Sequence, residues 1–410
     1  MALVEHLKYV RAACTVALTG SSVGAAQALH LSQSSVTRAV LALEAAVQQV
    51  VFDRSGRGMV PTPQWSDLLQ RCNRAFQHMS TASTRKSARN EMPNWMSCRL
   101  VLGIGPRHIR VLMSLAITGS ETISAAQLGI GQSAVHQTLA QLEHLSEREL
   151  FARSRQHGLR MTEFGVQVMR GCKLCLSELQ QADEVLAALS GRFEGRIVIG
   201  TLPFSVGPML PKVVNRVMRA LPGLRVTVID GTYDALIHQL RDAEIDLMIG
   251  ALRPQFAIQG LVQETLFIDR LAVVARAGHP LAQRKKLKWT DLRDAQWIMP
   301  MPNTPAQMVF ERVLGNGGLP LPAPEMRVNS ALMMQSLLMQ SERLAMMSPR
   351  QIRSEIEAGL FVVLPLPLLD AVRAIGLVRR ADVLLTPGMQ SLLATCRQVA
   401  GEIASKNEPE

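Results

Sequence analysis

The sequence predicts an α+β multidomain protein with two winged helix-turn-helix modules, a long linker helix and a two-subdomain α/β domain. Three observations support this fold class. A segment of about 60 residues occurs twice, a long amphipathic stretch follows the second copy, and strands alternate with helices from residue 195 onwards. A length of 410 residues suffices for roughly two to four domains.

The repeat is clearest where LSQSSVTRAVLALE (31–44) returns as IGQSAVHQTLAQLE (130–143). Each copy predicts a helix, a Thr-Gly-Ser break, a short helix, a tight turn and a longer helix. Two helices joined by a tight turn, the second polar on one face, form a helix-turn-helix. The predicted helices span 5–18, 23–29 and 33–48 in the first copy, and 106–117, 122–128 and 132–147 in the second.

The second helix of each pair carries the residues that we expect to contact DNA. In the first copy, Val36, Val40 and Leu43 recur at helical spacing and should face the core, while Ser32 should cap the helix. The remaining polar side chains suit base edges and phosphates. The candidates are Gln33, Ser34, Ser35, Thr37 and Arg38 in the first copy, and Gln132, Ser133, His136 and Gln137 in the second.

A glycine-rich basic stretch follows each of these helices and predicts a β-wing. Arg54 and Arg57 in the first wing, with Arg153 and Arg155 in the second, could reach the DNA backbone or the minor groove. The net charge of +11 is densest near the first copy, because residues 1–90 carry 10 Lys and Arg against 4 Asp and Glu. Residues 91–192 carry 10 against 9. We therefore expect both copies to bind DNA, the first with more electrostatic affinity; that one copy serves only packing or dimerisation stays open.

The connecting segments divide the chain further. Residues 66–105 should hold a connecting helix and a linker, since 80–98 is polar and weakly patterned. Residues 163–190 predict one amphipathic helix, whose apolar stripe needs a partner and is expected to form a helix–helix interface between two chains. The expected domains are 1–65, 66–105, 106–162, 163–192 and 193–405, the last split into subdomain I (195–266 and 373–405) and subdomain II (267–372).

The C-terminal half predicts an α/β fold with mostly parallel sheets, in which ligands bind at the carboxyl ends of strands. Those ends are nearly neutral and rich in hydroxyl and amide groups, which suits a small ligand held by hydrogen bonds. The candidate effector-binding residues are Thr201, Pro203, Phe204, Ser205, Thr232, Met301, Pro302, Asn329 and Ser330.

Several classes of protein are disfavoured. The six cysteines form no closely spaced framework, and Cys172 and Cys175 lack a second ligand pair, so we expect no metal, no cofactor and a reducing compartment. Lys8 and Arg11 interrupt any signal-peptide core, which favours a cytoplasmic protein with no membrane partner. No G-x-S-x-G, phosphate-binding loop or H-E-x-x-H motif indicates an enzyme. An aromatic content of 4% disfavours RNA binding.

The order of these motifs resembles the LysR-type transcriptional regulators over residues 100–400. The resemblance rests on a wing with F-x-R-x-x-R, a Thr-Pro ending, the long helix, and the segments GRIVIGT, PGLRVTVIDG and EIDLMIGA. It implies a regulator that binds double-stranded DNA as a homo-oligomer, a dimer or more typically a homotetramer, and that contacts RNA polymerase. It also implies a C-terminal domain similar to periplasmic binding proteins, with an effector in its cleft.

The segment GHPLA (278–282) resembles a branch that includes regulators of sugar uptake, so a sugar or an organic acid is the expected effector. The duplicated helix-turn-helix departs from the family pattern. A solute-binding protein and an architectural DNA-binding protein remain the alternatives.

Overall fold

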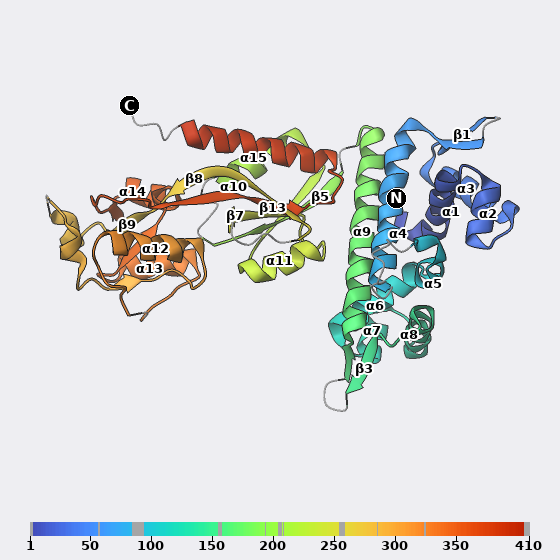
Figure 1. The fold of residues 1–410 in the computed structure, drawn as a ribbon, viewed down its shortest axis with the longest axis horizontal. Coiled ribbons are helices and arrows are strands. Elements are labelled where there is room, and N and C mark those ends of the chain that lie inside the picture. The colour runs from blue at the N-terminus through green and yellow to red at the C-terminus, as the bar shows by residue number, and fades with distance from the viewer. Residues whose placement is uncertain are drawn as a thin grey trace. The chain divides into compact units, whose positions relative to one another are not determined.

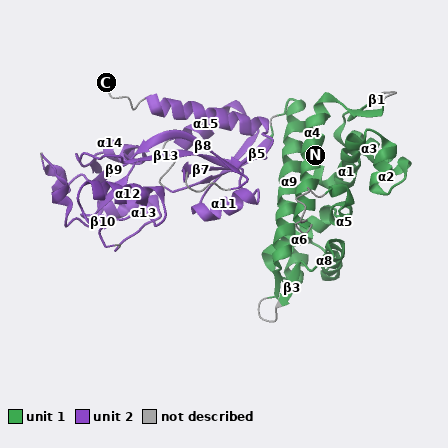
Figure 2. Ribbon diagram, viewed as in Figure 1, with its two compact units in different colours: residues 1–194 green, residues 195–410 purple. Residues whose placement is uncertain are grey.

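The computed structural model describes residues 3–55, 58–83, 94–154, 158–192, 194–203, 207, 209–253, 259–284, 286–323 and 325–405. Figure 1 shows the elements along the chain. The molecule divides into two compact units, residues 1–194 and 195–410, which Figure 2 distinguishes by colour and which are described separately below.

The first copy is a winged helix-turn-helix, and its predicted helices are confirmed. It consists of η1 (Leu3–His6), α1 (Leu7–Thr19), α2 (Ser22–Leu29), α3 (Gln33–Val47), β1 (Phe52–Ser55) and β2 (Gly58–Pro61). Ser32 caps α3 by accepting a hydrogen bond from the amide of Ser35, and Val36, Val40 and Leu43 are fully buried.

The second copy repeats this layout with α6 (Pro106–Thr118), α7 (Glu121–Leu128), α8 (Gln132–Ser146), β3 (Phe151–Ser154) and β4 (Gly158–Met161). The glutamate that recurs in both sequence copies has the same role in each. Glu44 Oε1 accepts hydrogen bonds from the amides of Val51 and Phe52 at 3.0 and 3.4 Å. Glu143 Oε1 accepts those of Leu150 and Phe151 at 2.9 and 3.3 Å. These contacts tie the end of each recognition helix to the start of its wing.

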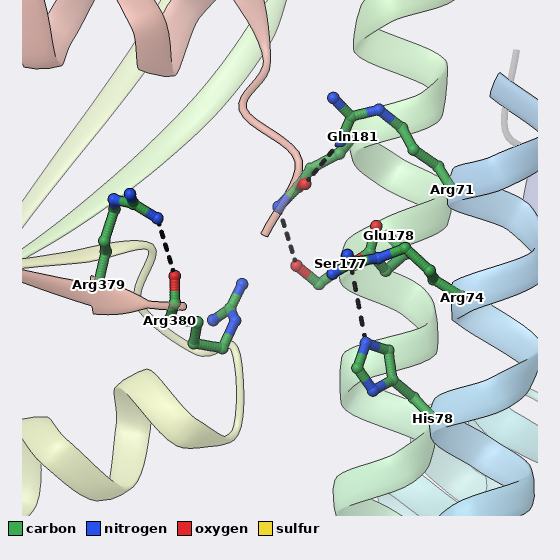
Figure 3. Close-up of polar contacts among 8 residues, drawn as sticks. All are labelled: Arg71, Arg74, His78, Ser177, Glu178, Gln181, Arg379 and Arg380. Carbon is green, nitrogen blue, oxygen red and sulfur yellow. Dashed lines mark hydrogen bonds and ion pairs between the residues drawn. The ribbon is translucent and has the colours of Figure 1, made fainter. Parts of the chain in front are cut away.

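Two long helices, α4 (Pro63–Ser83) and α9 (Glu163–Leu189), pack against each other within unit 1. Because Arg71 contacts Gln181 while Gly171 faces Ala82, the helices run antiparallel (Figure 3). Much of the α9 stripe, which was expected to face a second chain, is instead covered by α4: Met169, Leu179 and Leu186 are buried in a core shared with that helix, whereas Val166 and Leu189 are exposed. The apolar face of α4 was not recognised from the sequence, because α4 is more polar overall than α9.

Both described parts of the stretch 80–98, which was expected to be a linker, contain helical structure. Helix α4 extends to Ser83, and η2 (Trp95–Ser97) and α5 (Arg99–Gly103) follow the undescribed residues 84–93. Trp95 is buried, its ring lies 5.0 Å from that of Phe76, and its Nε1 donates to Asn73 Oδ1 at 2.6 Å. This contact returns the chain to the side of α4.

Unit 2 contains two sheets. The first has the order β6-β5-β7-β13-β8, formed by β5 (Gly195–Thr201), β6 (Leu224–Asp230), β7 (Leu247–Ala251), β8 (Leu261–Arg270) and β13 (Val372–Arg380). The second has the order β10-β11-β9-β12, formed by β9 (Ala272–Arg276), β10 (Trp297–Ile298), β11 (Leu344–Met347) and β12 (Phe361–Val363).

The expectation of mostly parallel sheets is wrong, because both sheets are mixed. Strand β13 pairs antiparallel with β7 and β8, and β9 pairs antiparallel with β11 and β12. The chain leaves the first sheet through β8 and returns through β13, so the returning strand runs against its neighbour. Residues 326–330 contribute an isolated bridge between Met299 and Arg327.

Helices cover both sheets. They are α10 (Met209–Ala220), α11 (Tyr233–Arg241), α12 (Pro305–Asn316), α13 (Ala331–Met339), α14 (Arg353–Glu357) and α15 (Pro387–Ser405), with short 3-10 turns η3 (Pro280–Gln283), η4 (Trp289–Leu292) and η5 (Pro349–Ile352). Pro208, which precedes α10 in the sequence, lies outside the described residues. Among described residues no single helix is long and apolar enough to cross a membrane, although the bent pair 3–19 and 22–29 would pass on length and composition.

Candidate nucleic-acid interface and ligand pocket

The recognition helix of the first copy, α3, presents its expected polar face to solvent. Gln33, Ser34 and Arg38 are exposed, while Ser35 and Thr37 are half-buried. Gln33 Nε2 donates to Ser22 Oγ at 3.2 Å, and Arg38 Nε approaches the carbonyl of Ser34 at 3.4 Å. Both contacts are between exposed groups, so these side chains can exchange them for base or phosphate contacts.

The recognition helix of the second copy, α8, exposes Gln132, Ser133, His136 and Gln137. Its surroundings differ from those of α3 in one acidic residue. Glu121 Oε1 lies 3.2 Å from His136 Nδ1 and 3.3 Å from Arg153 Nη2. The equivalent position in the first copy is Ser22, 99 positions earlier. A carboxylate therefore occupies two of the second copy's candidate DNA contacts.

Each wing is anchored to the turn that follows the first helix of its copy. The amide of Met59 donates to the carbonyl of Gly20 at 3.0 Å, and that of Leu159 to Gly119 at 2.8 Å. A Cβ at Gly58 or Gly158 would lie 2.6 Å from those carbonyl oxygens, and both glycines have positive φ angles, so glycine is required at each. Arg54 lies on β1 with an undescribed side chain, and Arg57 and Arg155 lie outside the described residues.

The ligand pocket lies in unit 2, has a volume of about 260 Å³, and is lined from both sheets. Five expected residues line it: Pro203, Thr232, Met301, Pro302 and Asn329. Thr201 does not line it; its side chain is buried and its hydroxyl donates to Asp230. Ser330 caps α13 by accepting from the amide of Met333. Phe204 and Ser205 lie outside the described residues.

The polar groups that dominate the pocket were not predicted. Arg253 stacks its guanidinium 3.9 Å from the ring centre of Tyr233, and burial lowers its pKa from the ordinary arginine value. Arg253 Nε, the Tyr233 hydroxyl and both amide atoms of Gln351 are buried without a hydrogen-bond partner among the described residues. Buried polar groups are normally paired, so these atoms leave hydrogen-bonding capacity unused at the pocket wall. Arg253 follows β7 closely and could have been considered from sequence; nothing in the sequence distinguishes Gln351.

The pocket is also bordered by helix N-termini. Thr232 caps α11 and Thr304 caps α12, and residues of both first turns line the cavity. Free amides and the helix dipole make such ends favourable for negative charge. Asp234 is the carboxylate among the lining residues.

A buried ion pair sits on the two strands that cross between the sheets. Arg373 on β13 donates from Nη2 to Asp269 Oδ2 on β8 at 3.1 Å, and Ser348 Oγ donates to Asp269 Oδ1 at 2.7 Å. Burial lowers the pKa of Arg373, whereas Asp269 opposes that shift. Arg373 also lines the pocket, so the pocket wall is continuous with the crossing strands.

No group of three or more His, Cys, Asp or Glu in the described part of the chain is placed to hold a metal ion. Cys172 and Cys175 are buried in the α4–α9 core, where burial raises the pKa of Cys172 to about 12. A buried thiol of this kind packs as a small apolar group.

Two helix-turn-helix modules with exposed polar recognition helices, joined in one chain to a two-sheet ligand-binding unit, define a ligand-responsive DNA-binding protein. Family comparison agrees. Residues 190–401 match the LysR substrate binding domain, and residues 7–64 and 106–166 each match the bacterial regulatory helix-turn-helix protein, lysR family. The chain belongs to the LysR family of transcriptional regulators, which bind DNA and a small-molecule effector in the substrate-binding domain.

Individual relatives match different shares of the chain. The chain is 31% identical over 401 residues to the HTH-type transcriptional regulator GalR of Pseudomonas putida, a match that spans 98% of this chain and 99% of GalR and so includes both copies. It is 25% identical to the regulator PcaQ of Agrobacterium fabrum, over 72% of this chain and 95% of PcaQ. Full-length CbnR complexed with its target DNA has a TM-score of 0.54 at 16% identity, covers 72% of this chain and 99% of that one, and shows the same fold.

Proposed function

We propose that this regulator binds double-stranded DNA through both α3 and α8, and that a small carboxylate-bearing molecule in the unit 2 pocket controls it. The single observation that carries the effector assignment is the group of unpaired buried polar atoms on Arg253, Tyr233 and Gln351. A guanidinium beside an amide and a hydroxyl suits a carboxylate and a second polar group. Between the two effector classes expected from sequence, these residues favour the organic acid over the sugar.

The pocket volume limits the size of the ligand. About 260 Å³ lies just below the roughly 300–1,000 Å³ typical of drug-sized ligand sites. Leu202, Ile298 and Met334 add apolar walls that suit a small organic acid with an apolar body.

Control of DNA binding follows from the position of the pocket between two sheets. Arg253 follows β7 of the first sheet, and Gln351 lies in η5, which follows β11 of the second sheet. A ligand that contacts both residues binds best at one particular distance between the two sheets. A ligand shifts a conformational equilibrium only through different affinities for its states, and a bridging contact supplies that difference. We further propose that the protein acts in the cytoplasm as a homo-oligomer and contacts RNA polymerase.

The effector proposal is tested by thermal melting of the full chain with a panel of small mono- and dicarboxylates, and with neutral sugars as controls. At least one carboxylate should raise the melting temperature in a concentration-dependent way, because ligand binding stabilises the folded state. Stabilisation by neutral sugars alone would contradict the carboxylate assignment.

The DNA proposal is tested by selecting binding sequences from a random duplex pool with the full chain and measuring affinity by fluorescence anisotropy across a salt series. Specific binding should weaken steeply with salt, as phosphate contacts require. A chain that enriches no sequence would contradict the proposal.

A further inference from the structure

The two helix-turn-helix copies make reciprocal contacts inside unit 1, as the two halves of a twofold-symmetric pair would. The copies are offset by 99 positions up to the wings, and by 100 from Thr62 and Thr162 onwards, so α4 and α9 are equivalent helices. Arg71 contacts Gln181, and the offset of 100 makes Gly171 and Thr81 the equivalent pair. This part of the two helices is also in close contact, because a Cβ at Gly171 would meet Ala82 and the backbone of Met79, which lie next to Thr81 in α4. An antiparallel pair of equivalent helices with reciprocal contacts is the geometry of a twofold dimer interface.

The first helices of the copies repeat this reciprocity. Arg11 in α1 donates to the carbonyls of Leu102 and Ile104, just before the second copy begins. Its equivalent in α6, Arg110, forms an ion pair with Glu5 at 2.8 Å, and position 5 is the equivalent of Ile104. Buried residues from both copies, α4 and α9 form one continuous hydrophobic core.

From this arrangement we infer that one chain supplies both DNA-binding modules of a complete two-module assembly and contacts both halves of a single operator, whose two half-sites differ in sequence. The inference rests on the proposed binding of DNA by α3 and α8. In the view of Figure 1 these two helices lie on the same side of the α4–α9 pair, α3 towards one end and α8 towards the other. Two recognition helices related by a twofold axis match half-sites about one helical turn apart, or a multiple of it.

The interface favours pairing of unlike copies over pairing of like ones. Arg74 in α4 and Glu178 in α9 form a largely buried ion pair, to which His78 also comes within 3.7 Å (Figure 3). With the offset of 100, Leu174 is the equivalent of Arg74, and His78 is the equivalent of Glu178. The equivalent pair is therefore Leu174 with His78, which is not an ion pair. Two α9 helices would leave Glu178 facing Leu174, and two α4 helices would place Arg74 against His78. A buried charge without its partner is strongly destabilising.

The recognition surfaces are also unlike, which is why the half-sites should differ. Thr37 and Arg38 in the first copy correspond to His136 and Gln137 in the second. Glu121 beside α8 has Ser22 as its counterpart beside α3. Arginine and glutamine side chains pair with different base edges in the major groove, so Arg38 and Gln137 should favour different bases.

The test is hydroxyl-radical footprinting of the full chain on an operator selected from a random duplex pool. Three proteins are compared: the wild type, a first-copy variant (Gln33→Ala, Thr37→Ala, Arg38→Ala) and a second-copy variant (Gln132→Ala, His136→Ala, Gln137→Ala). Circular dichroism and thermal melting confirm that each variant folds. We expect the two variants to lose protection on opposite halves of the operator, each with about tenfold or greater loss of affinity.

Other outcomes overturn the inference in distinguishable ways. If one variant loses both halves and the other loses neither, like copies from two chains contact the operator, while DNA binding itself stands. If an equimolar mixture of the two variants binds the operator with wild-type affinity, although each variant alone binds weakly, the paired copies come from different chains. If the wild type enriches no sequence, the proposed DNA binding fails and the inference fails with it.

Discussion

The guanidinium of Arg74 in α4 donates to Oε1 of Glu178 in α9 from Nη2 at 3.1 Å and from Nε at 3.3 Å, and the Glu178 side chain is only 6% exposed. This contact joins the two equivalent long helices at a position where the repeat offers no second ion pair. It is therefore a polar contact that distinguishes pairing of unlike copies from pairing of like copies.

Reversing either charge of this pair should destabilise unit 1. Arg74→Glu or Glu178→Arg places two like charges in a poorly solvated site, at a cost of about 3–5 kcal/mol. The double exchange should recover a large part of that loss, as chemical denaturation would show. The matched control is Arg353→Glu, which breaks an exposed pair with Glu357 and should cost under about 0.5 kcal/mol. A double variant no more stable than the singles would remove the pairing role of this contact.

Glu121→Ser should strengthen DNA binding. The substitution gives the second copy the residue that the first copy has at Ser22 and frees His136 and Arg153 from a carboxylate. Each additional phosphate contact adds about 0.9 to the slope of log affinity against log salt, so the slope should steepen by about one unit. Anisotropy across a salt series measures this. Glu147→Ser, at the far end of α8, is the control; an equal effect there would mean that only net charge matters.

Gly165→Ala should destabilise the junction between the second wing and α9. A Cβ at Gly165 would lie under 3.0 Å from the carbonyl of Leu150, and that backbone cannot move without disturbing its contact with Glu143. We expect a loss of about 1–3 kcal/mol from overpacking, measured by denaturation. Gly401→Ala, in α15 with open space around it, should be neutral or stabilising by up to about 1 kcal/mol. The same small effect at both sites would refute the steric reason.

Arg253→Gln should weaken effector binding by about 10-fold to 150-fold, because a hydrogen bond to a charged group contributes roughly 1.5–3 kcal/mol. Titration calorimetry with the carboxylate found by thermal melting provides the measurement. Arg312→Gln, whose exposed side chain donates to the carbonyl of Val372, should leave affinity unchanged. Unchanged affinity in Arg253→Gln would move the carboxylate site away from Arg253.

Asp183 should make unit 1 less stable as pH rises. Burial raises the pKa of Asp183 to about 6, although the amide of Leu3 donates to it and lowers that value. A carboxyl whose folded pKa exceeds its unfolded value of about 3.9 binds more protons when folded between these values, so its contribution falls as pH increases from about 4 to 6. Asp183→Asn should therefore raise the melting temperature relative to wild type at pH 7 and lose that advantage near pH 4. A difference that does not vary with pH would contradict this.

Local patterns predicted the helix-turn-helix copies well because their signals are local: turn residues, a cap at Ser32 and the periodic Val36, Val40 and Leu43. The partner of α9 was missed because the partner is another helix of the same chain, and a single amphipathic stripe does not say which apolar face covers it. Reading the repeat to its end would have found α4, since Cys72 and Cys172 are equivalent and both buried.

The pocket was predicted less completely than the DNA-binding face. Strand ends located Pro203, Thr232 and Asn329, since backbone topology decides where strands end. Gln351 lies in η5, the 3-10 turn after β11, and its approach to the cavity depends on how the second sheet folds back against the first. Contacts of that kind depend on long-range packing, which no local pattern in the sequence records.

The single hydrophobic core that joins both copies has a consequence for cellular dosage. A homodimer must assemble before it can occupy a palindrome, so its occupancy at low abundance rises with the square of subunit concentration. Two modules held in one chain meet at an effective concentration set by the connection between them, whatever the number of molecules present. The pairing of the two copies therefore adds no dependence on abundance of its own. Selection can also alter one half-site preference by mutating one copy, without changing the other.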